Sequence, residues 1–500
     1  MPIKEMLRDC PRVDQHRPWP RVVVDEEIWR SVAARLRDGE ITLSGLWGDT
    51  SAVHMAILDE TSTEMIVVGL DCPNGSFPSV GQVHPPAIRF ERAIEDLFGL
   101  TPLGSPDARN WLDHGRWGVR HPLGRRTEPV QPLAYAFLPS EGEGLHQIPV
   151  GPVHAGIIEP GHFRFTANGE AVVRLEERLG YVHKGIESLM QGADLMHAAK
   201  LAGRTSGDST LAYAVCFARA AEAALDIEAP ARAHCLRGLM AELERIANHF
   251  GDFGAVCNDA SFSLIYAHCG VLRERVLRAA QICFGHRLMR DCVVPGGTSV
   301  DLDEKSIATL REMLKHVRQQ FPEIVSTYDN TASLQDRTVA TGVLTPAFAR
   351  QFGAGGYVGR ASGRPFDARR AFAYRPYDQL EFAVPILEEG DVNARVWIRI
   401  REVEQSLSLV EQILARIPDG PIRANLPARG GEGVALVEGF RGDILVWLRL
   451  DDSGCVSRCY LRDPSWFQWP LLEAAIEGNI VADFPLCNKS FNCSYSGHDL

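Results

Sequence analysis

The sequence predicts an α+β protein with two modules: a small N-terminal α/β domain, and a large helical-bundle domain with peripheral β-sheets over residues 151–500. Three observations favour this. The 500 residues are 45% hydrophobic and 23% charged, which is enough for more than one core. Long stretches with helical apolar spacing occur only after about residue 194. A polar segment rich in Pro and Gly separates the two parts.

Residues 1–125 are predicted to form the small α/β domain. Residues 55–58 and 64–70 are β-rich and bounded by turn residues, so they are expected to be strands. Residues 90–98 have the apolar spacing of a short helix. Residues 126–150 are too rich in Pro, Gly and polar side chains to pack as one regular element, so we expect an interdomain linker there.

The second module is predicted to begin with strands and to continue with long helices. The dipeptide Asn168–Gly169 between residues 163–165 and 171–175 is typical of a β-hairpin. Residues 231–250 and 396–417 have the apolar spacing of long amphipathic helices. Further helices are expected near 204–225, 262–285 and 303–325, with a late strand over 443–450. Side chains from several such helices could line an internal site.

Composition excludes several classes of protein. The net charge of −12, from 52 basic and 64 acidic residues, argues against a nucleic-acid surface, and so we expect no nucleic-acid partner. No run of about 18 uncharged apolar residues is present. The twelve cysteines include no Cys-x-x-Cys pair, and the first residues do not have the pattern of an export signal. A reduced, cytoplasmic location is expected.

Several sequence blocks together resemble a known family. The first set of blocks is Phe90–Leu100, Gly104–Asp107 and Arg120–Leu123, and the second is Gly151–His154, Glu159–Arg164 and Gly180–Gly185. The first set resembles the small hydrophilic (30-kDa) subunit of respiratory complex I. The second set resembles the opening of its quinone-pocket (49-kDa) subunit and of the formate-hydrogenlyase large subunit, in which both modules are fused.

The resemblance identifies positions where relatives hold a nickel-iron centre. Those relatives use four cysteines in two Cys-x-x-Cys pairs, because soft, deprotonated sulfur can bridge nickel and iron. Here the corresponding positions are Ser206, Ser209, Ser494 and Gly497. An alcohol does not become such a ligand at neutral pH. The resemblance therefore implies a relative that has no nickel-iron centre and binds no cofactor through this chain.

The resemblance also raises the question of a quinone site. The quinone-pocket subunit uses a His in its first hairpin and a Tyr on the helix that replaces the cysteine motif. An ungapped comparison places Glu159–Pro160 at the His and Gly207 at the Tyr, so neither residue is retained. His162 and Tyr213 lie nearby in the sequence and could substitute for them.

Two acids and a histidine are candidates for a proton relay. Glu159 matches the acid that passes protons near the hydrogenase metal, and a carboxyl in an apolar cleft would hold a proton near neutral pH. The alternative is a Glu that only accepts backbone hydrogen bonds. His154 matches a histidine of both relatives, although satisfaction by backbone carbonyls is the favoured interpretation. Asp208 could relay protons or bind a hard cation, but pairing with Arg204 is expected first.

Arg204 matches an arginine that in complex I lies against the terminal cluster of the neighbouring subunit, and the alternative role for Arg204 is a buried salt bridge.

The expected function is a hydrogenase-related, complex I-like subunit, peripheral on the cytoplasmic side of the inner membrane. The implied partners are a small iron-sulfur subunit with a 4Fe-4S cluster, a ferredoxin-like subunit and antiporter-like membrane subunits. Quinone reduction and a purely structural scaffold remain as alternatives.

Overall fold

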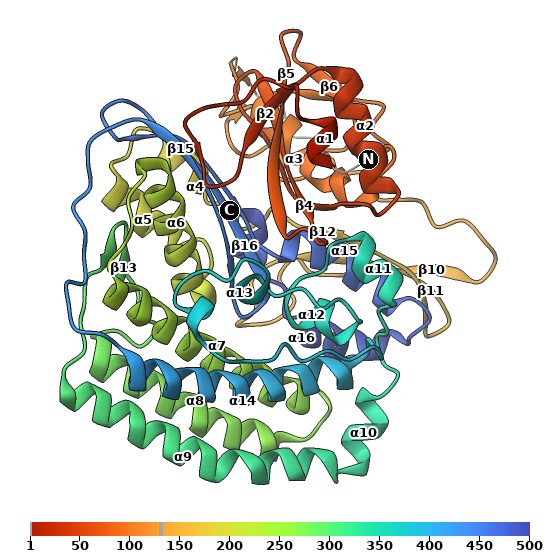
Figure 1. The fold of residues 1–500 in the computed structure, drawn as a ribbon. Helices are drawn as coiled ribbons and strands as arrows, with labels where there is room; N and C mark the ends of the chain where they lie inside the picture. The colour runs from red at the N-terminus through yellow and green to blue at the C-terminus, as the bar shows by residue number, and fades with distance from the viewer. Residues whose placement is uncertain (1–2, 126, 130–133) are drawn as a thin grey trace.

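The computed structural model describes residues 3–125, 127–129 and 134–500. Its N-terminal module, red and orange in Figure 1, contains a four-stranded sheet in the order β2-β5-β4-β3. The strands are β2 (Arg21–Val24), β3 (Thr42–Gly48), β4 (Ala52–Asp59) and β5 (Glu64–Asp71), and the helices α2 (Glu26–Arg37) and α3 (Ile88–Phe98) belong to the same module. The two predicted strands and the predicted helix are confirmed within β4, β5 and α3.

A second sheet packs against the first and joins the modules. It consists of β1 (His16–Arg17), β15 (Gly431–Glu438), β16 (Asp443–Leu450) and β17 (Val456–Arg462), in the order β1-β15-β16-β17. Trp47 of β3 stacks on Tyr460 of β17 with the ring centroids 4.7 Å apart, and it also contacts Trp447. Both faces of β4 are therefore buried, which explains its almost unbroken apolar sequence.

A three-stranded antiparallel sheet opens the second module. It consists of β10 (Leu145–Val150), β11 (His162–Asn168) and β12 (Ala171–Arg178), and the predicted hairpin turn is confirmed at Gly169, whose φ is 58°. β10 lies within the predicted linker. It is an edge strand that can accommodate Pro149, and this explains why its composition does not suggest a strand. Residues 126 and 130–133 of that linker lie outside the described residues.

Long helices form the lower part of the molecule in Figure 1. They are α7 (Ala231–Asp259), α8 (Ser263–Phe284), α9 (Glu304–Asp329) and α14 (Val392–Arg416), and they confirm the predicted bundle. α7 packs against both α8 and α14. The helix expected from residue 204 begins later, as α6 (Thr210–Leu225), because a short 3₁₀ turn at Gly207–Ser209 precedes it.

Shorter elements complete the fold. They are α1 (Ile3–Met6), β6 (Ser76–Pro78), β7 (Thr101–Leu103), β8 (Val119–Arg120), β9 (Glu128–Pro129), α4 (Ile186–Met190), α5 (Leu195–Ala202), β13 (Val293–Val294), β14 (Gly297–Thr298), α10 (Ala332–Thr338), α11 (Pro346–Gln351), α12 (Gly356–Ala361), α13 (Ala368–Ala371), α15 (Ser465–Ile476), α16 (Phe484–Phe491) and α17 (Tyr495–Asp499). Within the described ranges, no helix is long and apolar enough to cross a membrane.

Two glycines of β15 let helix α6 lie directly on the sheet. A Cβ at Gly433 would lie 2.0 Å from the Ala220 carbonyl oxygen, and one at Gly431 would lie 2.1 Å from that of Ala224. Both obstacles are backbone atoms that cannot rotate away. The contact therefore fixes α6, and with it the turn at residues 206–209 that leads into the helix.

The substitution Gly433→Ala is expected to destabilise the protein, since α6 would have to move off the sheet; overpacking of this kind costs about 1–3 kcal/mol. Gly270→Ala is the matched control. Gly270 lies inside α8 with open space where the added methyl group would lie, so this substitution should stabilise the helix by about 0.5–1 kcal/mol. Urea unfolding of both variants checks this. Equal urea midpoints for the two variants would show that α6 does not need a glycine at position 433 to lie on the sheet.

Candidate functional site

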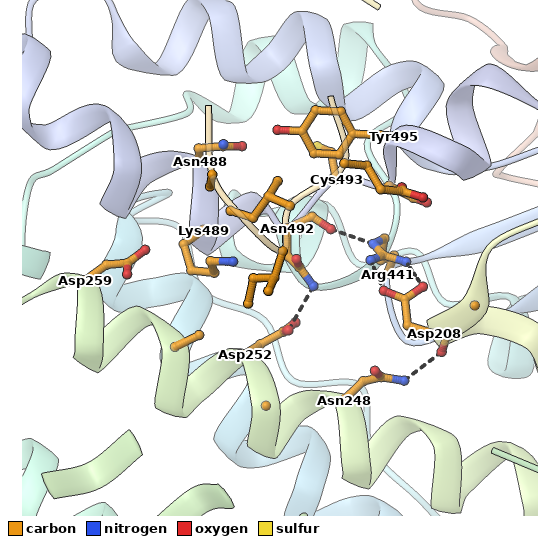
Figure 2. Close-up of a pocket in the computed structure, with 18 of the residues that line it drawn as sticks. Asp208, Asn248, Asp252, Asp259, Arg441, Asn488, Lys489, Asn492, Cys493 and Tyr495 are labelled. Atoms are coloured by element: carbon orange, nitrogen blue, oxygen red, sulfur yellow. Dashed lines mark hydrogen bonds and ion pairs between the residues drawn. The ribbon is translucent and has the colours of Figure 1, made fainter. Parts of the chain in front are cut away.

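A cleft of about 950 Å³ lies between α7, α8, α16, the 151–161 loop and the C-terminal residues. Figure 2 shows the end of this cleft where Asp208, Arg441 and Asn492 meet. Ser206 and Ser494 both line it, although they are 288 residues apart in the sequence. The fold thus brings together the two pairs of positions that correspond to the metal ligands of the relatives.

Three of the four metal-ligand positions carry hydroxyls that bond to protein groups. The Ser206 and Ser494 Oγ atoms are 2.8 Å apart, and Ser494 Oγ also accepts a hydrogen bond from the Gly497 backbone N–H at 2.9 Å. Ser209 Oγ accepts one from Arg441 at 3.2 Å. Hydroxyls remain protonated at neutral pH, so this donor set does not supply the thiolates that a nickel-iron centre needs.

The fourth position, Gly497, has no room for a ligand side chain. A Cβ there would lie 2.5 Å from Asp463 Oδ2. That carboxylate is held in place, because Tyr213 donates its hydroxyl to Oδ2 at 2.8 Å and the Ser465 N–H donates to Oδ1 at 2.9 Å. The nearby Cys493 is no substitute, since burial raises the pKa of its thiol well above the usual value.

Other metal ligands are not assembled elsewhere either. Across residues 3–125, 127–129 and 134–500, no group of three or more His, Cys, Asp or Glu side chains is placed to hold a metal ion. The structure therefore does not fit the metal centre of the hydrogenases.

Asp208 pairs with Arg441, and the expected pairing with Arg204 is wrong. The Arg441 guanidinium donates through Nη1 to Asp208 Oδ1 at 2.8 Å and through Nη2 to Oδ2, while Ser206 Oγ donates to Oδ1 at 2.8 Å. Burial opposes the ionisation of Asp208, but these groups prevail and lower its pKa below the usual range. Asp208 is thus a fixed negative charge, which makes it poorly suited to relaying protons near neutral pH.

Arg204 instead forms an ion pair with Asp291 at the protein surface. Nη2 lies 2.8 Å from Asp291 Oδ2, and each side chain is 38% exposed. This hydrogen-bonded pairing raises the pKa of Arg204. Arg204 follows α5 and is separated from the turn at 206–209 by Thr205, so its side chain reaches away from Asp208. The alternative prediction of a buried salt bridge is correct about the acidic partner. It is wrong about burial, because the pair lies at the surface.

A second layer of polar contacts holds the pair on helix α7. Asn248 Nδ2 donates to the Asp208 backbone oxygen at 2.8 Å, and Asn492 Nδ2 donates to Asp252 Oδ1 at 2.8 Å (Figure 2). The Arg441 Nε–H bonds the Asn492 backbone oxygen. The β15–β16 turn, α7 and the C-terminal segment are therefore linked through one network.

The loop at residues 151–161 brings His154 and Glu159 to the edge of the cleft. Its ends meet where the Gly161 N–H donates to the Pro152 oxygen at 2.9 Å. Glu159 is exposed, not enclosed by apolar groups as expected, because its carboxylate extends to the C-terminal segment and accepts the Ser496 N–H at 3.0 Å. His154 Nδ1 lies 3.1 Å from the Pro152 carbonyl oxygen, as the favoured interpretation predicted.

His162 and Tyr213 do not form a pocket together, contrary to the suggested quinone site. Tyr213 is fully buried on α6 and donates its hydroxyl to Asp463, so it cannot reach a molecule in the cleft. His162 is buried at the start of β11, with its ring centroid 4.9 Å from that of Phe137. Burial lowers the pKa of His162.

Two residues beside the turn, Arg441 and Glu244, were not predicted from the sequence. Arg441 lies at the β15–β16 turn, and only its place between Gly439 and Gly442 marks it in the sequence. Glu244 of α7 caps the first turn of α6 by accepting the Leu211 and Ala212 N–H groups at 2.8 and 3.1 Å. Burial, together with the nearby charge of Asp208, raises the pKa of Glu244 to about 8. Glu244 therefore holds a proton near neutral pH.

Glu244 makes a testable contribution to stability. Its pKa is raised in the folded state, so the folded protein binds the extra proton, and this stabilisation is lost as the pH rises from about 4.5 through about 8. Thermal unfolding between pH 5 and pH 8.5 should show wild type losing stability relative to Glu244→Gln as the pH rises. The exposed Glu323→Gln should show no such trend. A constant difference between wild type and Glu244→Gln would contradict the assignment.

Sequence comparisons define the class of protein. The family described as respiratory-chain NADH dehydrogenase, 30 Kd subunit, matches residues 22–132, and the 49 Kd subunit family matches residues 261–430. A solved structure of the membrane-bound sulfane sulfur reductase, an archaeal respiratory membrane complex, aligns with a TM-score of 0.68 at 24% identity. The alignment covers 72% of this chain and 99% of that chain, and it shows the shared fold.

Among individual relatives, formate hydrogenlyase subunit 5 of Escherichia coli (strain K12) is 30% identical, covering 90% of this chain and 82% of that protein. Hydrogenase-4 component G of the same organism is also 30% identical, covering 92% and 82%. The chain therefore belongs to the family of fused 30 Kd and 49 Kd complex I-type subunits that includes these two proteins. Its relatives are subunits of membrane-bound hydrogenases and complex I-like complexes.

Proposed function

We propose that this chain is a peripheral subunit of a membrane-associated, hydrogenase-4-like complex, on the cytoplasmic side of the inner membrane. It couples electron transfer through a partner iron-sulfur subunit to ion translocation, without a nickel-iron centre of its own. The observation that carries this proposal is the Arg441–Asp208 pair, which lies against Ser206 and Ser209 in the cleft.

The pair supports the absence of a metal because it adds a positive charge where a metal cation would need anionic ligands. The Arg441 guanidinium contacts Ser209, one of the ligand positions, at 3.2 Å. Burial opposes its charge, but Asp208 raises the pKa of Arg441 well above its usual value. The Arg441 guanidinium would repel a metal cation at the serine positions, and the Asp208 carboxylate beside them already pairs with Arg441.

The exposed loop beside the cleft supports a partner subunit. Val153 and Ile157 are 80% and 97% exposed there, so two large apolar side chains of one loop are available for contact with a partner. In this proposal the small iron-sulfur subunit, with its 4Fe-4S cluster, covers the loop. Ferredoxin-like and antiporter-like membrane subunits complete the complex, as the family resemblance implies.

Within this complex, Glu244 is the group that would respond to an arriving electron. It lies on α7, where burial and the negative charge of Asp208 raise its pKa to about 8, close to neutral pH. An added negative charge in the partner would favour its protonated form. Since Glu244 caps α6 and α6 carries the serine turn, its protonation would be coupled to the position of that turn. The cleft is then a redox-linked coupler.

Ion uptake by proteoliposomes that contain the whole complex tests this function, with reduced viologen as donor and a short-chain quinone as acceptor. Asp208→Asn should lower the number of ions moved per electron about 5-fold or more, because it removes the fixed charge that couples the turn to Glu244. Glu411→Gln, which removes a carboxylate paired with Arg318 on the outer face, should leave the ratio unchanged. Normal assembly with an unchanged ratio in Asp208→Asn would instead support a structural scaffold.

A second candidate, quinone reduction in the cleft, is favoured by one specific contact. The Tyr495 hydroxyl lies 3.4 Å from His154 Nε2, and both residues line the cleft. A quinone head group in the cleft could accept the hydrogen of the Tyr495 hydroxyl in place of His154 Nε2, which has no proton to donate because the ring N–H is on Nδ1 and bonds the Pro152 oxygen. In the same assay, Tyr495→Phe should then slow quinone reduction about 10-fold or more, while Tyr266→Phe in the same cleft should not. Equal rates for the two variants would exclude this candidate.

A further inference from the structure

A second cavity, of about 610 Å³, lies at the junction of the two modules. Its walls come from α6, the first turn of α7, β15 and the segment that follows α13. The N-terminal module contributes Trp19 and Thr63. None of the residues that line it lines the cleft described above. The cavity is therefore a separate feature.

The guanidinium of Arg219 has no anionic partner in this cavity. Its Cζ lies 4.5 Å from the centroid of the Tyr374 ring, and its Nε is buried without a hydrogen-bond partner. Within the part of the chain that the structure describes, Arg219 donates no side-chain hydrogen bond and forms no ion pair. The neighbouring Glu222 carboxylate is near enough to favour the charged form of Arg219, but its hydrogen bonds go to Arg237 at 3.0 Å and to the Gly296 N–H at 2.8 Å.

Two more cavity residues can donate hydrogen bonds to an anion. His234 is only 6% exposed, and its Nε2 has no hydrogen-bond partner. Burial and the three nearby arginines lower the pKa of His234 to about 4, so the neutral ring has one N–H to donate. Arg375 lies at the same cavity, and among the residues that the structure describes its one ion pair is with the exposed Glu228, at 3.1 Å.

Arg219 is half-buried and stacks on Tyr374 but forms no ion pair, so its guanidinium is placed to pair with an anion that enters the cavity. The other part of the cavity is apolar: the Trp19 and Phe372 rings are 4.9 Å apart and both line it. Small-molecule sites in proteins are typically cavities of about 300–1,000 Å³, and this cavity of about 610 Å³ lies within that range. Cations are disfavoured, because both carboxylates of the cavity, Glu222 and Glu228, already pair with arginines.

We propose that this cavity binds a small organic anion, a carboxylate or phosphate with an apolar or aromatic body. Arg219 pairs with the anionic group, His234 and Arg375 donate further hydrogen bonds, and Trp19 with Phe372 contacts the body. Because Trp19 belongs to the N-terminal module and Arg219 to the second, a bound anion would link the two modules. The site does not depend on the function proposed for the cleft.

Calorimetric titration of the purified full-length chain tests the site, with benzoate, adenosine monophosphate and inorganic phosphate as probes. Binding of benzoate identifies a carboxylate ligand, and binding of adenosine monophosphate identifies a phosphate ester. Arg219→Gln should weaken the binding about 10-fold or more, because a charge-assisted hydrogen bond is lost. Arg318→Gln, which removes an equal charge from the exposed face of α9, should bind as wild type does.

Thermal unfolding without added anion separates a binding role from a structural one. Removing a half-buried charge that forms no ion pair should leave the unfolding temperature of Arg219→Gln equal to or above that of wild type. Saturating anion should raise the unfolding temperature of wild type and leave that of Arg219→Gln unchanged. Failure of all three probes to bind at millimolar concentration, equal binding by Arg219→Gln, or a clearly lower unfolding temperature of this variant would overturn the proposal.

Discussion

The ion pair between Arg441 and Asp208 holds together the parts of the chain that form the cleft. Arg441 comes from the turn between two strands, Asp208 from the turn before α6, and the Asn492 oxygen that Arg441 also bonds comes from the C-terminal segment. A charge-assisted, bidentate contact of this kind has a defined geometry. Together with its contact to Ser209 and the Ser206–Asp208 hydrogen bond, it fixes the positions of Ser206 and Ser209.

The same region depends on close backbone packing. The glycines of β15 let α6 approach the sheet, and the sheet in turn packs on the N-terminal module through Trp47 and Trp447. A shift of either module would therefore be transmitted to the serine turn. The anion cavity between the modules lies on this same helix, α6, at Arg219. Both proposed sites thus act on one rigid element.

Regular elements could be predicted from the sequence, because their apolar residues repeat with the period of the structure they form, as in residues 90–98 and 231–250. The strand at 145–150 could not, since an edge strand with proline lacks that pattern. The candidate site was located through its serines. The partner of Asp208 could not be predicted, because Arg441 is 233 residues away in the sequence and only the tertiary fold brings it close. The exposure of Glu159 likewise depends on where the C-terminal segment lies.

Elemental analysis of the purified chain measures whether the cleft holds a nickel-iron centre. The protein should be produced together with hydrogenase maturation factors. We expect no stoichiometric nickel or iron in the chain, because hydroxyls, a glycine and an arginine occupy the ligand region. Nickel and iron each present at one atom per chain, and lost in a Ser206→Ala variant, would contradict this expectation.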